Sequence, residues 1–480
     1  MSSFLRISLI YIVIIFSIPT AWARQPLGSK AIPPGVKQAL AKQRIPLMSL
    51  GLAVLDPEGR PLLMHQADKA FNPASTMKLL TTFAALDLLG PAHQWRTELW
   101  STAPVVNGVL KGDLYIKGQG DPKLTIESMW LLLRKLRAAG IHTIEGRLVQ
   151  DRTAFGQVAV ENEAQFDEQP ERAYNVKPDA LLINFKAVGL DIQSDSQKIV
   201  ARYEPALFGV ALDNQLALVD GDCELWRSGM ERVRIEGRRL LLAGRFPRQC
   251  HQLFYTGLLT HFEFDDLLIR ALWSEMGGKL IGEGADGRVP AEAHLIAAHA
   301  SSPLAELVRD INKVSNNVMA RQLFLGLGVG RDDTQPLRTN ARLAVESWLH
   351  GQNLRFPELV LENGSGLSRS EQISPAHLAS LLQLARNHRY GPELMASLPI
   401  AGVDGTLRRH FVDTGLASEV RAKTGSLDNV RALAGYVRDR QGRGRIMVAM
   451  INHDRAEAAW PVFEALAKWV ASGGSRTHAR

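Results

Sequence analysis

Residues 71–80 read Phe-Asn-Pro-Ala-Ser-Thr-Met-Lys-Leu-Leu and contain a serine followed one helical turn later by a lysine, Ser75-Thr76-Met77-Lys78. Taken alone, a Ser-x-x-Lys pattern is weak evidence, because it recurs about once by chance in a chain of 480 residues. Two further triplets follow in a fixed order, Ser315-Asn316-Asn317 and Lys423-Thr424-Gly425. Together the three patterns predict an acyl-transfer site built on an active serine.

The residues after Ser75 have helical periodicity. Apolar side chains recur every three or four positions from Met77 to Leu88, and Gly90 is typical of a helix end. We therefore expect Ser75 at the N-terminus of a helix, with Lys78 one turn further along the same face. A serine in this place often only caps its helix, and a lysine is often only solvated, so a structural role is the alternative for each.

Predicted helices and strands also surround the other two triplets. An apolar stripe from Leu304 to Ile311 predicts a helix that ends near Ser315, and a second helix is expected over 318–325. Lys423-Thr424-Gly425 lies in the first of three strands expected near the C-terminus, which are 419–425, 432–438 and 445–452. The alternatives are an ordinary interhelical loop for the second triplet and an ordinary edge strand for the third.

A serine hydroxyl becomes an effective nucleophile only when a neighbouring base takes its proton. Lys78 is within reach of Ser75, but its amine must be neutral to act as that base. Burial and a second cation both lower the pKa of a lysine, and we expect Lys423 to supply the second charge. Ser315 is expected to relay a proton to the leaving group, and Asn317 is expected to orient a substrate amide.

The strand with the Lys-Thr-Gly triplet is expected to bind the substrate. Lys423 and Thr424 are suited to hold a substrate carboxylate, and Gly425 lets a substrate backbone approach closely. A developing oxyanion needs N–H donors, which we expect from the main chain of Ser75 and Ser426. Neither a metal nor an organic cofactor is expected.

Both ends of the chain are expected to build one sheet. A helix at 35–43 precedes two strands, 49–55 and 61–65, joined by the turn signal Asp56-Pro57-Glu58-Gly59. With the C-terminal strands they give an α+β fold, an antiparallel sheet of about five strands beside a helical subdomain. The amphipathic helix at 456–471 is expected to pack on this sheet, and peripheral contact with a membrane surface is the alternative.

Residues 95–290 have a different character. They contain many short runs of alternating polarity separated by glycines, with one clear helix at 126–139. We interpret them as an inserted β-rich region of one or two subdomains, which interrupts a discontinuous domain of residues 24–94 and 291–472. The strand-like runs are 109–118, 146–150, 190–200 and 233–243. Residues 473–480 are expected to form a loose tail.

Residues 1–23 have the features of a secretory signal peptide. Arg6 precedes an apolar run from Ile7 to Ile18, and Ala21-Trp22-Ala23 has the pattern of a cleavage site. The run is short for a membrane span of about 20 residues. We therefore expect an exported protein that is soluble or peripheral after cleavage, with an uncleaved anchor as the alternative.

Export permits disulfides, and the chain contains only two cysteines. We expect a single bridge between Cys223 and Cys250, and two buried thiols are the alternative. Neither cysteine has the paired spacing of a zinc site.

The formal net charge of +7 and the isoelectric point of about 9.4 favour anionic partners. Nucleic acid is disfavoured, because the chain has an export signal and lacks a dense basic run with interleaved aromatic residues. An anionic cell envelope is the expected partner, although a charge of this size also fits a role in solubility alone.

These motifs and their order resemble those of D-alanyl-D-alanine carboxypeptidases/endopeptidases of the penicillin-binding protein 4 type, the class C low-molecular-mass penicillin-binding proteins. The resemblance covers nearly the whole mature chain. It includes the gap of 240 residues between Ser75 and Ser315 and three further stretches. These are Gly-Gln-Gly-Asp-Pro at 118–122, Glu-Asn-Gly-Ser-Gly-Leu-Ser-Arg at 362–369 and Leu-Pro-Ile-Ala-Gly-Val-Asp-Gly at 398–405. It implies a fold like that of penicillin-binding proteins and serine β-lactamases, with inserted domains.

The resemblance also implies a role for each motif residue. Ser75 is then the acylated nucleophile and Lys78 the general base, and the site is completed by Ser315, Asn317 and Lys423. The implied enzyme is periplasmic, removes terminal D-Ala from peptidoglycan stem peptides or cleaves D-Ala–diaminopimelate crosslinks, and is acylated by β-lactam antibiotics.

Some members of this family hold the diaminopimelate side chain with an acidic residue and a Phe of the first inserted domain. The resemblance implies Asp151 and Phe155 for these places and Arg369 for a third. Asp428 takes the fourth, where a glutamine-like contact is expected, so this departure leaves the side-chain specificity open. Asn316 stands where Asp is common, and we do not expect a loss of activity from it.

Two other functions fit parts of the sequence. A serine β-lactamase needs an extra base for deacylation, such as a Glu-x-x-x-Asn beyond the second motif, and no convincing one is present there. The long insert also argues against that class. The second alternative is a non-catalytic penicillin-binding envelope protein, which the intact motif side chains disfavour.

Overall fold

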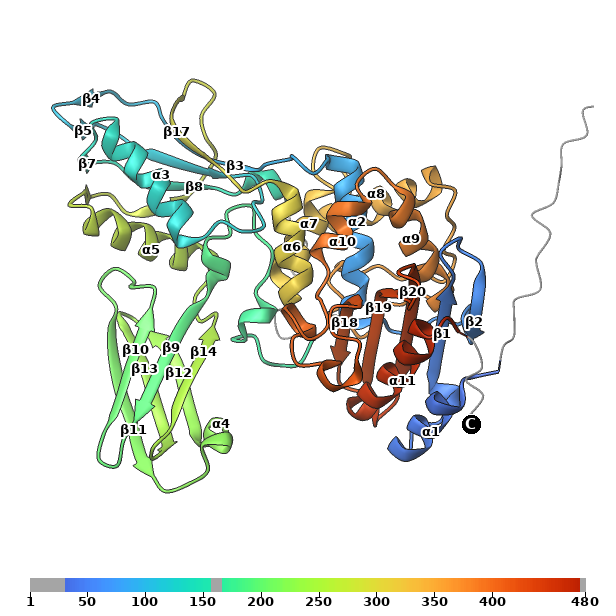
Figure 1. The fold of residues 1–480 in the computed structure, drawn as a ribbon. Helices are drawn as coiled ribbons and strands as arrows, with labels where there is room; N and C mark the ends of the chain where they lie inside the picture. The colour runs from blue at the N-terminus through green and yellow to red at the C-terminus, as the bar shows by residue number, and fades with distance from the viewer. Residues whose placement is uncertain (1–30, 157–165, 475–480) are drawn as a thin grey trace, which may run out of the picture.

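The computed structural model describes residues 31–156 and 166–474 of the chain. The predicted signal peptide and the end of the predicted tail, 475–480, lie outside the described residues. Figure 1 shows two regions side by side. We call residues 31–95 and 301–474 the main part, and residues 96–300 the inserted region.

The main part is built on one antiparallel sheet with the strand order β18-β19-β20-β1-β2. Both ends of the chain contribute, as predicted, and β18 lies at one edge. The strands are β1 (Leu50–Leu55), β2 (Pro61–His65), β18 (Val420–Leu427), β19 (Val430–Arg438) and β20 (Gly444–Asn452).

Helices cover both faces of this sheet, which explains why every residue of β1 is buried. Side chains alternate between the faces along a strand, so Leu52 and Val54 join one apolar core while Ala53 and Leu55 join another. The first core contains α1 (Pro34–Gln43) and α11 (Trp460–Ala471), and Phe463 and Leu466 of α11 are fully buried in it. The amphipathic C-terminal helix therefore packs on the sheet.

The opposite face carries a helical layer around α2 (Lys78–Leu89). Every residue of this helix from Lys78 to Leu86 is buried, as expected for a helix inside a protein core. A 3₁₀ turn, η2 (Ala74–Met77), precedes it. The surrounding helices are α6 (Leu304–Val314), α7 (Asn317–Gly326), α8 (Leu337–Gly351), α9 (Pro375–Asn387) and α10 (Gly391–Ser397).

The inserted region has an upper and a lower lobe in Figure 1, and a single apolar core runs through both. The upper lobe contains a five-stranded sheet, β16-β8-β6-β3-β17, a smaller sheet, β15-β7-β5-β4, and two helices. Its elements are β3 (Arg96–Ser101), β4 (Val105–Val106), β5 (Val109–Leu110), β6 (Leu114–Gly118), α3 (Ile126–Ala138), β7 (Thr143–Ile144), β8 (Leu148–Asp151), α5 (His261–Glu275), β15 (Lys279–Leu280), β16 (Gly284–Asp286) and β17 (His294–Ala300).

The lower lobe consists of two three-stranded sheets, β10-β9-β14 and β11-β13-β12. A disulfide joins Cys223 to Cys250 in this lobe. Its elements are β9 (Val188–Ser194), β10 (Ile199–Glu204), β11 (Ala211–Val219), α4 (Trp226–Gly229), β12 (Met230–Glu236), β13 (Arg239–Pro247) and β14 (His251–Thr256).

The structure corrects three expectations for the inserted region. It contains a second long helix, α5, where only one was predicted; Thr260 and Glu263 form the capping box that starts it. The region ends at Ala300 rather than at 290, because β17 pairs with β3 in the upper sheet. Each of the runs 190–200 and 233–243 is not one strand but contains parts of two strands and the turn that joins them.

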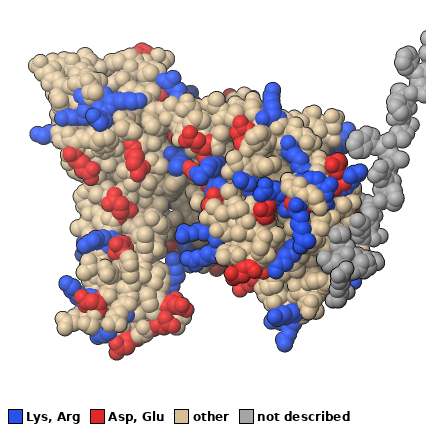
Figure 2. All heavy atoms as spheres, in the orientation of Figure 1, with Lys and Arg blue, Asp and Glu red and all other residues tan. Residues whose placement is uncertain are grey.

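Lys and Arg side chains gather over the main part and along the edge of the hollow that separates it from the inserted region, as Figure 2 shows. Within the described residues, no helix is both long enough and apolar enough to cross a membrane.

Candidate active site

Ser75 lies on a tight turn that leads directly into α2, so its hydroxyl stands at the start of the helix. The preceding Ala74 is buried with a φ of 43°, a conformation that residues other than glycine rarely adopt. Two glycines press on this turn. A Cβ added at Gly366 would lie 1.9 Å from the carbonyl oxygen of Ala74, and one at Gly425 would lie 2.5 Å from that of Pro73. Close packing on two sides therefore fixes the backbone of the serine.

The side chain of Lys78 is completely buried beside Ser75. Its Nζ lies 2.9 Å from Ser75 Oγ and 2.6 Å from Asn317 Oδ1, and it also donates to the carbonyl oxygen of Ser365. The amide and carbonyl oxygens can only accept, so each takes an N–H of the lysine. A neutral amine has two N–H groups and one lone pair. Its lone pair then faces the one partner that can donate, the Ser75 hydroxyl.

The surroundings of Lys78 favour this neutral amine. Complete burial, followed by the nearby charge of Lys423, holds the pKa of Lys78 well below its ordinary value of 10.5. The charge of Arg321 acts in the same direction, and that of Glu371 opposes it. The predicted pairing of a serine with an amine of lowered pKa is thus present in the structure.

Ser315 ends α6 in the left-handed conformation, with a φ of 61°. This turn brings its Oγ to a second fully buried lysine: Lys423 Nζ donates to Ser315 Oγ at 2.8 Å and to the carbonyl oxygen of Thr424 at 2.8 Å. Burial lowers the pKa of Lys423 to about 7. The five motif side chains named from the sequence therefore form two groups of contacts, Ser75–Lys78–Asn317 and Ser315–Lys423, and the charge of Lys423 acts on Lys78.

The middle residue of the second motif has a structural role. Asn316 is the N-cap of α7, and its Oδ1 accepts the N–H of Met319 at 3.0 Å. Asn and Asp are equally good caps at this position. Because the cap holds the start of α7, it also fixes Asn317, the first residue of the helix, in contact with Lys78.

The segment 398–406 links the end of α6 to β18. Lys313 of α6 forms an ion pair of 2.6 Å with Asp404, whose other oxygen accepts the N–H of Ile400 at 2.8 Å. Thr424 Oγ1 donates to Thr406 Oγ1 at 2.7 Å. These contacts hold Ser315 and the Lys-Thr-Gly strand in a fixed relation.

The same segment covers only part of the outer edge of β18. Ala401 N–H donates to the Val420 oxygen at 2.9 Å, and Ala422 N–H donates to the Pro399 oxygen at 3.0 Å. No strand of the described part of the chain pairs with this edge from Lys423 onward. An extended peptide can therefore approach this edge beside Ser75. The space that a Gly425 side chain would need is filled by Pro73 and Ala74 and is not open to a substrate.

A known protein family matches most of the chain. The model of the D-Ala-D-Ala carboxypeptidase 3 (S13) family matches residues 34–472. The chain belongs to this family. The D-alanyl-D-alanine carboxypeptidase DacB of Haemophilus influenzae is 30% identical over 393 residues, which cover 79% of this chain and 80% of the relative. The fold of this chain is also similar to that in crystal structures of penicillin-binding protein 4 from the same organism.

Two of those crystal structures align with this chain at 25% sequence identity. Each alignment covers 91% of this chain and 99% of the chain in the crystal structure. One has a TM-score of 0.75. The other, which is a complex with a β-lactam, has a TM-score of 0.73. The predicted family and the predicted fold class are confirmed.

At the outer edge of the site, Arg369 forms an ion pair of 3.0 Å with Asp428. The guanidinium of Arg369 also lies 4.7 Å from the ring centroid of Phe166. Phe166 packs against the small cluster of Ala74 and the β18–β19 turn. Phe166 could not be assigned from the sequence, because the only signal is a single aromatic side chain in the polar run 161–170.

Asp151 is not brought to this site. It is buried, its Oδ1 accepts from the N–H and the hydroxyl of Thr153, and its Oδ2 accepts the N–H of Val289 at 2.9 Å. Both carboxylate oxygens of Asp151 therefore accept hydrogen bonds from other residues of the protein, and these bonds hold the end of β8 in place. A role of Asp151 in substrate binding has no support in this geometry.

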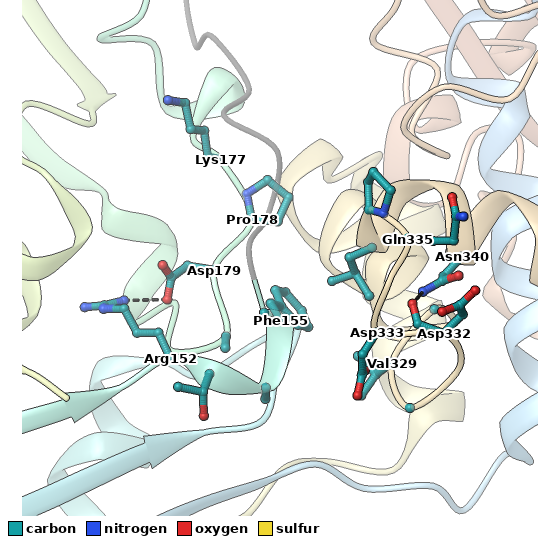
Figure 3. Close-up of a pocket in the computed structure, with 18 of the residues that line it drawn as sticks. Arg152, Phe155, Lys177, Pro178, Asp179, Val329, Asp332, Asp333, Gln335 and Asn340 are labelled. Carbon is teal, nitrogen blue, oxygen red and sulfur yellow. Dashed lines mark hydrogen bonds and ion pairs between the residues drawn. The ribbon is translucent and has the colours of Figure 1, made fainter. Parts of the chain in front are cut away.

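Phe155 lies elsewhere too, in the wall of a cavity of about 1070 Å³ between the inserted region and the segment 328–340 (Figure 3). This segment follows the C-terminal end of α7, about 15 Å along the helix axis from Asn317. The cavity is lined by none of the five motif residues. We therefore do not assign Phe155 to the site around Ser75.

Proposed function

We propose that the protein is a serine DD-peptidase of peptidoglycan that works through an acyl-enzyme on Ser75. The observation that carries this proposal is the contact of Lys78 Nζ with Ser75 Oγ at 2.9 Å, in a site where burial and Lys423 lower the pKa of the amine. A serine hydroxyl hydrogen-bonded to a neutral amine is an activated nucleophile.

In the acylation step, Lys78 takes the hydroxyl proton while Ser75 Oγ attacks the carbonyl carbon of the penultimate D-Ala. The N–H groups of Ser75 and Ser426 donate to the oxyanion. The C–N bond then breaks, and the amine of the leaving group receives a proton through Ser315, which Lys423 contacts. Water later attacks the ester carbonyl and gives a proton to Lys78. Lys78 passes this proton to Ser75 Oγ as the ester C–O bond breaks and the shortened peptide leaves.

Substrate binding follows from the open edge of β18. Lys423 and Thr424 hold the terminal carboxylate of the leaving D-Ala, and an extended peptide pairs with the unpaired edge of the strand. Arg369, with the exposed Asp428 beside it, meets the side chain next to the scissile bond. Cleavage of D-Ala–diaminopimelate crosslinks uses the same acyl-enzyme with a larger leaving amine.

We also infer an exported enzyme that acts in the periplasm and is inhibited by β-lactams. The inference on location depends on the signal pattern of residues 1–23. We infer inhibition from the chemistry of Ser75, because a strained cyclic amide acylates the same hydroxyl. In addition, a β-lactam complex is known for the penicillin-binding protein 4 of H. influenzae.

The test is digestion of a pentapeptide that ends in D-Ala-D-Ala and of purified crosslinked peptidoglycan, followed by analysis of free D-Ala, monomers and dimers. Wild-type protein should release D-Ala, and Ser75→Ala should abolish the release. Activity that survives Ser75→Ala would exclude this site. The lifetime of a penicillin adduct separates the β-lactamase alternative, because turnover within seconds would favour a lactamase and a slow adduct a peptidase.

A further inference from the structure

A buried carboxylate lies behind the active site and is not used by the mechanism above. Glu371 is completely buried, and its Oε1 accepts three consecutive main-chain N–H groups, those of Glu362, Asn363 and Gly364, at 3.1, 2.9 and 2.9 Å. Three donors on one oxygen are a strong anchor, because bonds to an ionised acceptor are about twice as strong as neutral ones. The carboxylate therefore fixes the start of the 362–369 segment.

That segment reaches both residues of the nucleophile pair. The carbonyl oxygen of Ser365, next to the anchored Gly364, accepts an N–H of Lys78. Gly366, one residue further, packs directly on the carbonyl of Ala74, the residue before Ser75. A shift of a few tenths of an ångström in this segment would change the direction of the Lys78 lone pair and the position of the Ser75 backbone together.

We propose that Glu371 is a positioning residue of the acyl-transfer site, which holds the Ser365 carbonyl on Lys78 and places a negative charge behind the general base. The proposal rests on the proposed function, because it assumes that Lys78 accepts the proton of Ser75. Glu371 lies outside the three motifs. It acts through the main-chain carbonyl of Ser365, which no side-chain substitution can remove.

The negative charge of Glu371 should change the pKa of Lys78 in a direction that can be measured. Lys78 is faced by Lys423 and Arg321, which lower its pKa, and by Glu371, which raises it. Glu371 is itself faced by the Glu362 carboxylate, and burial raises its pKa while the three N–H groups lower it. Removal of the negative charge should therefore lower the pKa of Lys78 further, so that the base becomes active at lower pH.

The experiment measures the second-order rate constant of acylation by a fluorescent penicillin between pH 5 and 9. Glu371→Gln keeps the length of the side chain and removes the charge. Glu371→Asp keeps the charge and withdraws the acceptor by one methylene. In the Gln variant, the acidic limb of the pH–rate profile should move to lower pH by about half to one unit. In the Asp variant, the limb should stay in place while the rate falls about tenfold or more, because the base is misplaced.

An unchanged acidic limb in Glu371→Gln, or wild-type acylation in Glu371→Asp, would overturn the proposal. Each variant tests it independently, so it remains falsifiable when one of them fails to fold. The wild type is labelled first in every series. Absence of Ser75-dependent labelling there would contradict the proposed function itself, whereas a normal wild-type profile with insensitive Glu371 variants would contradict only the positioning role.

Discussion

Lys423 Nζ and Ser315 Oγ lie 2.8 Å apart, although they belong to a sheet edge and a helix end separated by 108 positions in the chain. Lys423 is fully buried, and the charged form of a lysine is costly in such a place. The burial of Lys423 at this position therefore lowers the stability of the fold.

This relation predicts the effect of Lys423→Met. The folded pKa of Lys423, about 7, lies below the ordinary 10.5, so the unfolded state binds more protons between these two values and stability rises with pH across that window. The Met variant should lose this rise and be more stable than wild type by about 1–3 kcal/mol at pH 6. Its peptidase activity should be lost. Denaturant unfolding at pH 6 and pH 9 checks the prediction, which fails if the variant is less stable at pH 6.

Asn316 should tolerate Asp and not Ala. Its side chain caps α7 through Met319 N–H, and Asp accepts the same bond. We expect wild-type D-Ala release and thermal stability for Asn316→Asp. Asn316→Ala should lose about 1 kcal/mol of stability and some activity, because Asn317 follows directly. A large loss of kcat in the Asp variant would show that the residue has a chemical role.

Gly425 should not accept a side chain. A Cβ there would lie 2.5 Å from the carbonyl oxygen of Pro73, beside the nucleophile turn. We expect Gly425→Ala to reduce penicillin acylation more than tenfold, since a displacement of the serine backbone misaligns the attack. Gly351→Ala is the matched control, because its Cβ meets nothing within 4 Å at the end of α8. Equal acylation in both variants would contradict the packing argument.

The disulfide should stabilise the lower lobe without serving catalysis. Cys223 and Cys250 close a loop with a sequence separation of 27 and touch none of the site residues. The double Ala variant should lose about 2–4 kcal/mol of stability in that lobe. Penicillin acylation should continue at the wild-type rate. Limited proteolysis and acylation kinetics measure the two effects, and slow acylation in a folded variant would show coupling between lobe and site.

The local parts of the site could be predicted from the sequence. Ser75 and Lys78 are one helical turn apart, and helical periodicity after them was sufficient to place both on one face. Ser315 and Lys423 were assigned from motif order, and the strand pattern at the C-terminus correctly placed Lys423 at a sheet edge. The sheet itself followed from alternating runs at both chain ends.

Contacts between distant segments could not be predicted in this way. Glu371 is an ordinary polar residue in the sequence, and its role depends on three main-chain groups of a turn. Phe166 reaches the outer edge of the site through its contacts with Arg369 and with the cluster around Ala74. Asp151 was expected to bind substrate, but its two oxygens are used inside the inserted region. The α5 helix was missed although Thr260 and Glu263 have capping-box spacing.

Acylation of Ser75 is the step on which the proposed reaction depends. The most direct test is brief incubation with benzylpenicillin, followed by protease digestion and tandem mass spectrometry of the peptide that contains Ser75 and Lys78. We expect one penicilloyl group per chain, located on Ser75 and absent from Ser75→Ala. An adduct on any other residue, or none on folded wild-type protein, would contradict it.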